Sequence, residues 1–438
     1  MGALGPIMPG ERALARKPFM RNVAKVAGGT AAAQAITIAF YPIITRLYGP
    51  EAFGILGLFM VVVAVLTPIA GLTYPIAIVL PRSDRDAVGL AWLSLTIAIV
   101  TSVVVTLVLA VFSERIIALF GLERIAPFIF LVPLVILFTT MLATTQQWLI
   151  RTKQFTLTAS VAVLQAFIVN AAKAGLGFIQ PLASSLIAVS TLGIAGHATM
   201  LAIGRRWRGA AREDPAPDAP QKKLVELARI YRDFPLFRAP QELLNALSHG
   251  LPLILLAGFY GTAVAGFYAL AYSVLAAPIT LIGNSVGNVL YPRLAEAANR
   301  GEDLRRLVLL PTGALFLIGI IPFGTIMLAG PALFAFVFGD EWREAGEYAR
   351  WMALWLAFGF ANIPSVKVIP VINEQKRFML YGASSAFLRI ASVCIAYYLG
   401  FDQLFAVIFV SISSAVLIIF LIVAVAFRVR HFQSGSVK

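Results

Sequence analysis

The sequence has almost no residues suited to disulfide formation or metal binding. Its single cysteine, Cys394, lies in an apolar run, which excludes an intramolecular disulfide and a cysteine-based metal site. The three histidines, His197, His249 and His431, are far apart in the sequence and lack the spacing of metal ligands. We therefore expect no metal centre and no cofactor.

Charge is also scarce, since only 13% of the 438 residues are charged and 60% are hydrophobic. Soluble globular domains carry about 25% charged and about 45–50% apolar residues, so this composition excludes a soluble globule. The first 22 residues contain no short apolar core followed by a cleavage site, so we expect no signal peptide. The mean hydropathy of +0.87 is typical of a chain that lies mostly in a membrane.

Long apolar runs make up most of the chain. Their length and lack of charge favour helices, because barrel strands would appear as alternating segments of about ten residues. The sequence therefore predicts an all-α polytopic membrane protein with about twelve transmembrane helices. The predicted spans are 23–45, 54–80, 87–112, 126–149, 156–178, 182–204, 237–259, 264–290, 307–329, 346–371, 378–399 and 404–427.

The basic residues predict the orientation of these spans. Most of the 35 Lys and Arg lie in the terminal segments and in the loops after even-numbered spans. The loops after odd-numbered spans contain only Arg46, Arg115, Arg124, Arg343 and Arg350. By the positive-inside rule both termini are expected in the cytoplasm. The basic runs are typical of anchors that meet anionic lipid, and we expect no nucleic-acid partner.

The chain divides into two similar halves. Residues 205–235 are rich in Pro, Ala and charge and predict a flexible cytoplasmic linker between residues 1–204 and 236–438. Each half contains an even number of spans, so the two copies share one orientation, as in transporters with parallel repeats. We therefore predict two six-helix lobes. The recurring motifs are Tyr48-Gly49, Gly54 and Phe120-Gly121 in the first half and Tyr260-Gly261, Gly266 and Phe338-Gly339 in the second.

Polar residues recur at helical spacing along the first span of each half and along the second span of the second half. Interhelical hydrogen bonds would explain any one of them, and Arg238 and Glu242 are also spaced as an i,i+4 ion pair. Two matched stripes favour a hydrated cavity between the halves. The candidate cavity-lining residues are Thr30, Gln34, Thr37, Tyr41, Arg238, Glu242, Asn245, His249, Asn284 and Asn288.

Three cations, Lys173, Lys367 and Arg389, fall inside predicted spans. Arg389 lies about 16 Å deep at 1.5 Å per residue, where a cation costs about 2.5–3.5 kcal/mol and requires a cavity or a partner. The two lysines lie nearer to span ends, from which a lysine can reach the interface. Of the 21 carboxylates only Glu242 lies inside a span. This balance favours an anionic substrate, and a guanidinium binds phosphate through two parallel hydrogen bonds.

Four stretches resemble a known family. RLYGPEAFGILGLF (46–59) and AIVLPRSDRDA (77–87) resemble the first half of bacterial polysaccharide-biosynthesis membrane proteins. These are the Wzx-type flippases, which are related to the MATE multidrug exporters. YRDFPLFRAPQELLNALSHGLPLILLAGFYG (231–261) and VGNVLYPRLAEA (286–297) resemble the second half. Relatives often carry Arg-Tyr-Glu where this chain has Thr73, Tyr74 and Pro75, so no role for that charged pair is transferred.

The resemblance implies a MATE-like fold, in which two lobes face each other across a cationic central cavity. It also implies the flipping of an undecaprenyl-pyrophosphate-linked oligosaccharide from the inner to the outer leaflet by alternating access. We expect Arg389, with Lys173 and Lys367, to bind the pyrophosphate while the polar stripes contact sugar hydroxyls. The implied partners are membrane lipid and the glycan polymerase and glycosyltransferases of the same pathway, in a bacterial inner membrane.

Two other functions remain open from the sequence. A MATE-like, ion-coupled exporter of organic cations would need carboxylates in its cavity, and only Glu242 is a candidate. A membrane glycosyltransferase or glycan polymerase would need catalytic groups on an outer loop, whereas the longest such loop, 338–346, is short. We therefore predict a transporter without enzyme activity. The scarcity of membrane carboxylates leaves the coupling ion undefined.

Overall fold

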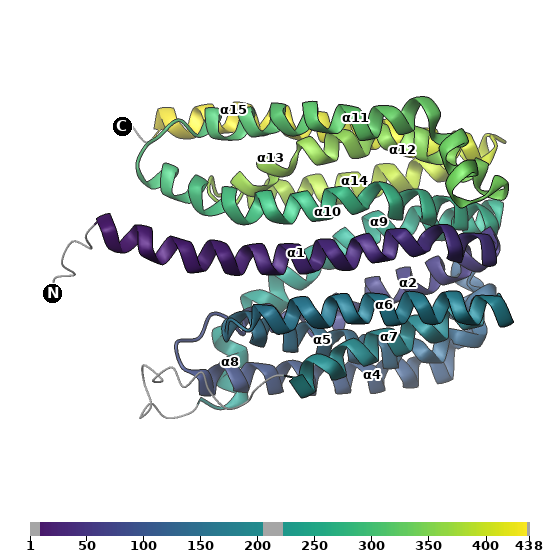
Figure 1. Cartoon of the computed structure of the whole chain (residues 1–438), viewed down its shortest axis with the longest axis horizontal. Coiled ribbons are helices and arrows are strands. Elements are labelled where there is room, and N and C mark those ends of the chain that lie inside the picture. Colours follow the sequence, from purple (N-terminus) through teal and green to yellow (C-terminus); the bar gives the residue numbers. More distant parts are fainter. Residues whose placement is uncertain (1–8, 205–221, 436–438) are drawn as a thin grey trace.

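The computed structural model describes residues 9–204 and 222–435, and in this part of the chain every regular element is a helix. The side chains of residues 9–27, 284, 285, 288, 299 and 431–435 lie outside the description. The helices form an elongated bundle, and α1 begins at the same end at which α15 finishes (Figure 1).

The helices of the first half are α1 (Pro9–Leu47), α2 (Pro50–Ala70), α3 (Tyr74–Ala77), α4 (Asp84–Phe120), η1 (Glu123–Leu131), α5 (Val132–Arg151), α6 (Phe155–Ile179) and α7 (Ala183–Gly204). The helices that follow are α8 (Leu224–Ile230), η2 (Phe234–Arg238), α9 (Ala239–Tyr260), α10 (Thr262–Asn299), α11 (Leu304–Phe338), η3 (Asp340–Trp342), α12 (Arg343–Ala361), α13 (Ile363–Val368), α14 (Gln375–Tyr398) and α15 (Gln403–Gly435).

Every predicted span falls on a helical segment. Within the described residues, ten helices are long and apolar enough to cross a membrane. The remaining two predicted spans correspond to α1 and to α12 with α13, which pack within the same bundle. The prediction of one continuous span over 54–80 was wrong. Helix α2 ends at Ala70, and the left-handed residues Leu72 and Thr73 separate it from α3.

Local sequence signals explain where several of the long helices begin and end. The Ser83 hydroxyl accepts a hydrogen bond from the Arg85 amide and caps α4, and Asp303 caps α11 in the same way. Helix α4 ends at Gly121, whose φ of 63° lies in the left-handed region that glycine adopts without a steric penalty. These short polar signals divide an almost continuous apolar sequence into separate helices.

The helices pack as two lobes with matching internal contacts. In the first lobe α1 packs on α6 and α5 packs on α4 and α7, and correspondingly in the second α9 packs on α14 and α12 packs on α11 and α15. The repeated tyrosines each bond a backbone carbonyl within their own lobe. The Tyr48 hydroxyl donates to the Lys173 carbonyl (3.0 Å), and the Tyr260 hydroxyl donates to the Phe401 carbonyl (3.1 Å). The internal repeat is therefore visible in the packing of each lobe.

The two lobes meet most closely where α2 crosses α10, at the repeated glycines Gly54 and Gly266. A Cβ atom built on either glycine would overlap the backbone of the opposite helix, so only glycine permits this crossing. Near the same end of the bundle, the Trp342 indole N–H donates to the Thr45 carbonyl (3.0 Å). A buried apolar core with residues from both lobes surrounds this contact.

The described part of the predicted linker is helical and docked on the first lobe, which differs from the flexible segment expected. Leu227 of α8 is fully buried and lies over Gly89 of α4. The Tyr74 hydroxyl donates to the Ala228 carbonyl (3.1 Å). The Lys222 ammonium pairs with Asp86 (2.8 Å), and this hydrogen bond raises the pKa of Lys222. Residues 205–221, the rest of the linker prediction, lie outside the described part.

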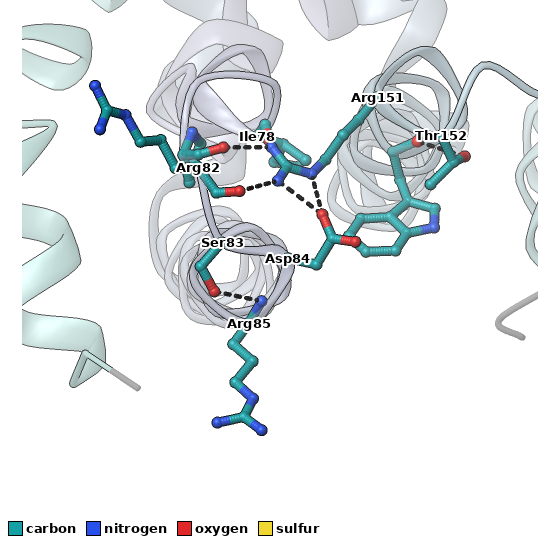
Figure 2. A network of polar contacts seen from close by, with 9 residues as sticks. Ile78, Arg82, Ser83, Asp84, Arg85, Arg151 and Thr152 are labelled. Atoms are coloured by element: carbon teal, nitrogen blue, oxygen red, sulfur yellow. Dashed lines mark hydrogen bonds and ion pairs between the residues drawn. The ribbon is translucent and has the colours of Figure 1, made fainter. Parts of the chain in front are cut away.

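The stretch between α3 and α4 is held by Arg151, the last residue of α5 (Figure 2). Its guanidinium donates to Asp84 through Nε (2.8 Å) and to the Pro81 carbonyl through Nη1 (2.7 Å). Arg151 is only 11% exposed, so these bonds are shielded from water and geometrically constrained. The turn that begins α4 is therefore fastened to the end of α5.

Candidate functional site

The larger cavity of the molecule lies within the second lobe. Its volume is about 920 Å³, and its walls come from α9, α10 and α12 to α15. The lining combines basic groups, amides, hydroxyls and aromatic rings. The charged, polar and aromatic lining residues include Arg238, Glu242, Asn245, His249, Tyr272, Trp355, Lys367, Tyr381 and Arg389.

Arg389 is the deepest charged group of this cavity. It lies nine residues before the end of α14, hence about 14 Å from that end at 1.5 Å per residue. Its side chain is 5% exposed. The guanidinium donates to the Ser414 hydroxyl (3.0 Å), the Ser248 carbonyl (3.3 Å) and Nδ1 of His249 (3.1 Å). Because a guanidinium can only donate, His249 accepts at Nδ1, and its Nε2 is the ring nitrogen that carries the proton.

Aromatic rings, and no carboxylate, complete the surroundings of Arg389. The central guanidinium carbon lies 4.7 Å from the centroid of the Trp355 ring, within cation–π range. The His249 ring stacks on the same indole at 6.3 Å between centroids. None of the ion pairs formed by the described residues includes Arg389. The cation is thus held by neutral partners and retains its full positive charge toward the cavity.

Four further predicted residues of the second lobe line the same cavity, namely Arg238, Glu242, Asn245 and Lys367. Arg238 and Glu242 form an i,i+4 ion pair (2.6 Å), as their spacing suggested. Lys367 lies against Gly287 of α10, where a larger residue would collide with its side chain. Asn245 also lines the cavity, and along α9 it lies between Glu242 and His249, the histidine that contacts Arg389. Glu242 is the only carboxylate that lines the cavity.

A smaller cavity of about 410 Å³ lies inside the first lobe, between α1, α5, α6 and α7. The predicted residues Thr30, Gln34, Thr37 and Lys173 all line it. Asn170 fastens one wall, because its amide donates to the Thr37 hydroxyl (3.2 Å). The two predicted stripes therefore line two cavities, one in each lobe, and not one shared cavity. Lys173 and Arg389 accordingly belong to different cavities.

Three predicted residues are not among the described lining of either cavity. Tyr41 lines neither and instead packs against the core shared by the lobes, with a hydrogen bond to Ser273 of α10. Asn284 and Asn288 belong to α10, but their side chains lie outside the described part of the structure. Tyr41 therefore faces the second lobe, and its role as a cavity residue stays a prediction.

Sequence reasoning missed several important cavity residues. Trp355, Tyr272 and Tyr381 surround Arg389, yet aromatic residues in an apolar span give no signal that separates a cavity wall from a core. Ser414 is fully buried in α15 and was not distinguishable from other small residues. His197 lines the first-lobe cavity, and its isolation in the sequence concealed its proximity to Lys173.

The arrangement in the second lobe is suited to binding an anionic, hydroxyl-rich ligand. Nε and Nη1 of Arg389 are occupied by protein acceptors, whereas Nη2 makes no hydrogen bond with a described residue. Two N–H groups therefore remain for an acceptor in the cavity. Amides and phenols on the walls can bond sugar hydroxyls, and aromatic faces can pack on sugar rings.

Comparisons with known proteins agree with this architecture. A family model described as "Polysaccharide biosynthesis protein" matches residues 43–347. No curated protein sequence matches the chain. The fold is similar to an inward-facing MATE family multidrug resistance transporter of the MOP superfamily, with a TM-score of 0.72 and 14% identity over 93% of this chain and 96% of that one.

Two further solved structures share the fold. The lipid II flippase MurJ, in an inward closed conformation, has a TM-score of 0.70 and 12% identity, covering 94% of this chain and 90% of that one. A MOP superfamily transporter from Pyrococcus furiosus, described by the reverse polarity of its binding pocket, has a TM-score of 0.64 and 14% identity, covering 94% and 96%. At such identities these structures show the fold alone, which is that of a multi-pass membrane transporter or flippase.

Proposed function

The chain belongs to the polysaccharide biosynthesis protein family, and from this premise we propose that it is a flippase for a lipid-linked oligosaccharide. The proposed substrate is an O-antigen or exopolysaccharide repeat unit on undecaprenyl pyrophosphate. It would move from the inner to the outer leaflet of a bacterial inner membrane. A transport role requires no bond to be made or broken in the protein, so we propose that the chain is not an enzyme.

The single observation that carries this proposal is Arg389, a buried cation without a carboxylate partner in a cavity of about 920 Å³. Its Nη2 group bonds no described residue, and no carboxylate pairs with the guanidinium, so an anionic group in the cavity meets an uncompensated positive charge. A pyrophosphate matches the fork geometry of a guanidinium. Lys367 adds a second cation to the cavity lining.

The wall of the same cavity supports the oligosaccharide part of the substrate. Asn245, Tyr272 and Tyr381 offer amide and hydroxyl groups, and Trp355 offers an aromatic face. The prenyl chain requires no polar cavity and would remain in the lipid. The cavity therefore has to admit only the pyrophosphate and sugars, which are the parts that cannot cross the hydrocarbon core unaided.

Two lobes joined at one close crossing support alternating access. The Gly54–Gly266 contact lies toward the turns that follow α1 and α9, while the linker helix α8 docks at the other end. With both termini in the cytoplasm, as the basic loops predict, the glycine contact lies on the outer side. Rocking of the lobes about this region would open the cavities to each side in turn.

The test is a flipping assay with the purified protein in proteoliposomes and a fluorescent lipid-linked oligosaccharide. Arg389→Met should lower the rate about 10- to 100-fold, since hydrogen bonds to charged groups contribute about 1.5–3 kcal/mol. Arg389→Lys should retain part of the activity because it keeps the charge but loses the fork. Unchanged glycan export at equal expression in Arg389→Met cells contradicts the proposal.

Arg350→Met is the matched control for this test. Arg350 is an arginine of the same lobe, and its guanidinium bonds the Met327 carbonyl (2.9 Å) and Glu347 away from the cavity. The variant should flip at close to the wild-type rate. Thermal unfolding of all variants in detergent identifies any that lose activity through misfolding.

A second candidate function is the export of organic cations, which the likeness to multidrug MATE transporters favours. The cavity chemistry opposes it, because Glu242 is the only lining carboxylate and Arg238 already neutralises it. Drug susceptibility decides between the two. Overexpression that raises drug resistance without supporting glycan export would favour an exporter, whereas restored export in a flippase-deficient strain favours our proposal. Glycosyltransferases and a polymerase of the same pathway are the proposed protein partners.

A further inference from the structure

Two side-chain nitrogens on the wall of the first-lobe cavity have no hydrogen-bond or ion-pair partner among the described residues. Lys173 of α6 lines the cavity, and its ammonium takes part in no ion pair or hydrogen bond among the described residues. Nε2 of His197, from α7, is buried and has no hydrogen-bond partner. Two helices thus supply the cavity wall with an ammonium and an imidazole Nε2 that bond no described residue.

Among the described residues, none that lines this cavity is acidic. Its polar members are threonines, glutamines, Asn170, His197 and Lys173. Two of the glutamines, Gln34 of α1 and Gln146 of α5, use their amides in no hydrogen bond between described residues. No acidic residue among the described lining offers Lys173 a counter-charge, so an anion that enters the cavity meets an unpaired ammonium.

The rest of the cavity wall leaves room for such a solute. Ala33 on α1 faces Ala159, Ala162 and Ala166 on α6, and these small side chains surround the polar groups without filling the space. The volume of about 410 Å³ accommodates an inorganic anion together with several water molecules. Asn170, bonded to Thr37 and to the Ala166 carbonyl, keeps α1 and α6 at this separation.

We propose that this first-lobe cavity is a binding site for a small inorganic anion, held by Lys173, His197, Gln34 and Gln146. The site is separate from the one that contains Arg389, since the two cavities share no lining residue. A bound anion neutralises Lys173 in the lobe interior and bridges α1, α5, α6 and α7. The proposal does not depend on the identity of the transported substrate.

The experiment measures equilibrium binding of radiolabelled chloride to the purified full-length protein in detergent, without lipid-linked substrate. Wild type should bind chloride saturably, and Lys173→Met should lose one chloride equivalent or weaken its affinity at least 10-fold. Lys173→Arg, which keeps the charge, should retain that equivalent. Gln34→Leu leaves the charge in place and should weaken chloride binding by a smaller factor, about 3-fold.

Arg350→Met, outside both cavities, is the control and should bind chloride as wild type does. Gel filtration and the unfolding temperature show whether each variant is folded. Chloride binding that is equal in wild type and folded Lys173→Met overturns the proposal, as does a wild type that binds no chloride. If only undecaprenyl phosphate binds, and Lys173→Met abolishes that binding, the anionic group belongs to the substrate and the inorganic-anion site is also overturned.

Discussion

The two lobes have similar folds, but the cations that line their cavities differ in whether other protein groups bind them. In the second lobe Arg389 is held by Ser414, Ser248 and His249 and lies over Trp355. In the first lobe the ammonium of Lys173 has no partner among the described residues. A guanidinium held in one geometry is suited to recognising a fixed anionic group, whereas an unpaired ammonium is suited to an anion that exchanges with solvent.

The sharpest test of this contrast removes each cation in turn. Arg389→Met should lower flipping about 10- to 100-fold, because hydrogen bonds to charged groups contribute about 1.5–3 kcal/mol. Lys173→Met should lower it less than about 3-fold, because the proposed substrate contacts lie in the other lobe. Initial flipping rates in proteoliposomes measure both. An effect of Lys173→Met as large as that of Arg389→Met would abolish the distinction between the lobes.

The next test concerns the contact that joins the lobes. Gly54→Ala forces a Cβ into the backbone of α10 and should destabilise the protein by about 1–3 kcal/mol. Gly258→Ala is the matched control, because nothing lies within 4 Å of its added Cβ. Alanine at this helical position should be neutral or stabilising by up to about 1 kcal/mol. Unfolding temperatures in detergent compare the two, and equal values would show that the lobes do not need the close crossing.

A smaller effect should come from the indole beside Arg389. Trp355→Leu removes the cation–π contact, worth about 0.5–2 kcal/mol, and should raise the KM for the lipid-linked oligosaccharide several-fold. Trp355→Phe should raise it less, because a ring remains and the indole N–H has no partner to lose. Gln165→Leu, in the other lobe, should leave KM unchanged. A wild-type KM in the Trp355→Leu variant would show that the indole does not contribute to substrate binding.

The smallest effect should come from the linker, whose helix α8 packs on α4 of the first lobe. Lys222→Met removes the ion pair with Asp86 and should cost less than about 1 kcal/mol, because the lysine is partly exposed. The pair raises the pKa of Lys222, so its stabilisation is complete below the ordinary lysine pKa and is lost as pH rises through the raised value. The difference in unfolding temperature between variant and wild type should persist at neutral pH and vanish at strongly alkaline pH.

The sequence predicted the helical membrane fold, the two lobes and the family, and each of these is confirmed. Helical spacing also placed Arg238, Glu242, Asn245 and His249 on one cavity wall. The spacing could not predict that the polar residues of α1 line a different cavity, because spacing along one helix does not specify which neighbouring helix its face contacts. Tyr41 illustrates this limit, since it follows the stripe of Thr37 but packs against the opposite lobe.

By itself the sequence determined that the chain enters a membrane, where its helices lie, and that Arg389 is a cation buried deep within one of them. These are local properties, since hydropathy, helix caps and depth along a span depend on consecutive residues. Only the tertiary structure decided that Arg389 bonds residues from α9 and α15, and that Lys173 lies in another cavity beside His197. Such groupings depend on how helices distant in sequence pack together. An apolar span has several similar faces, and only the packing of the bundle decides which face contacts which neighbour.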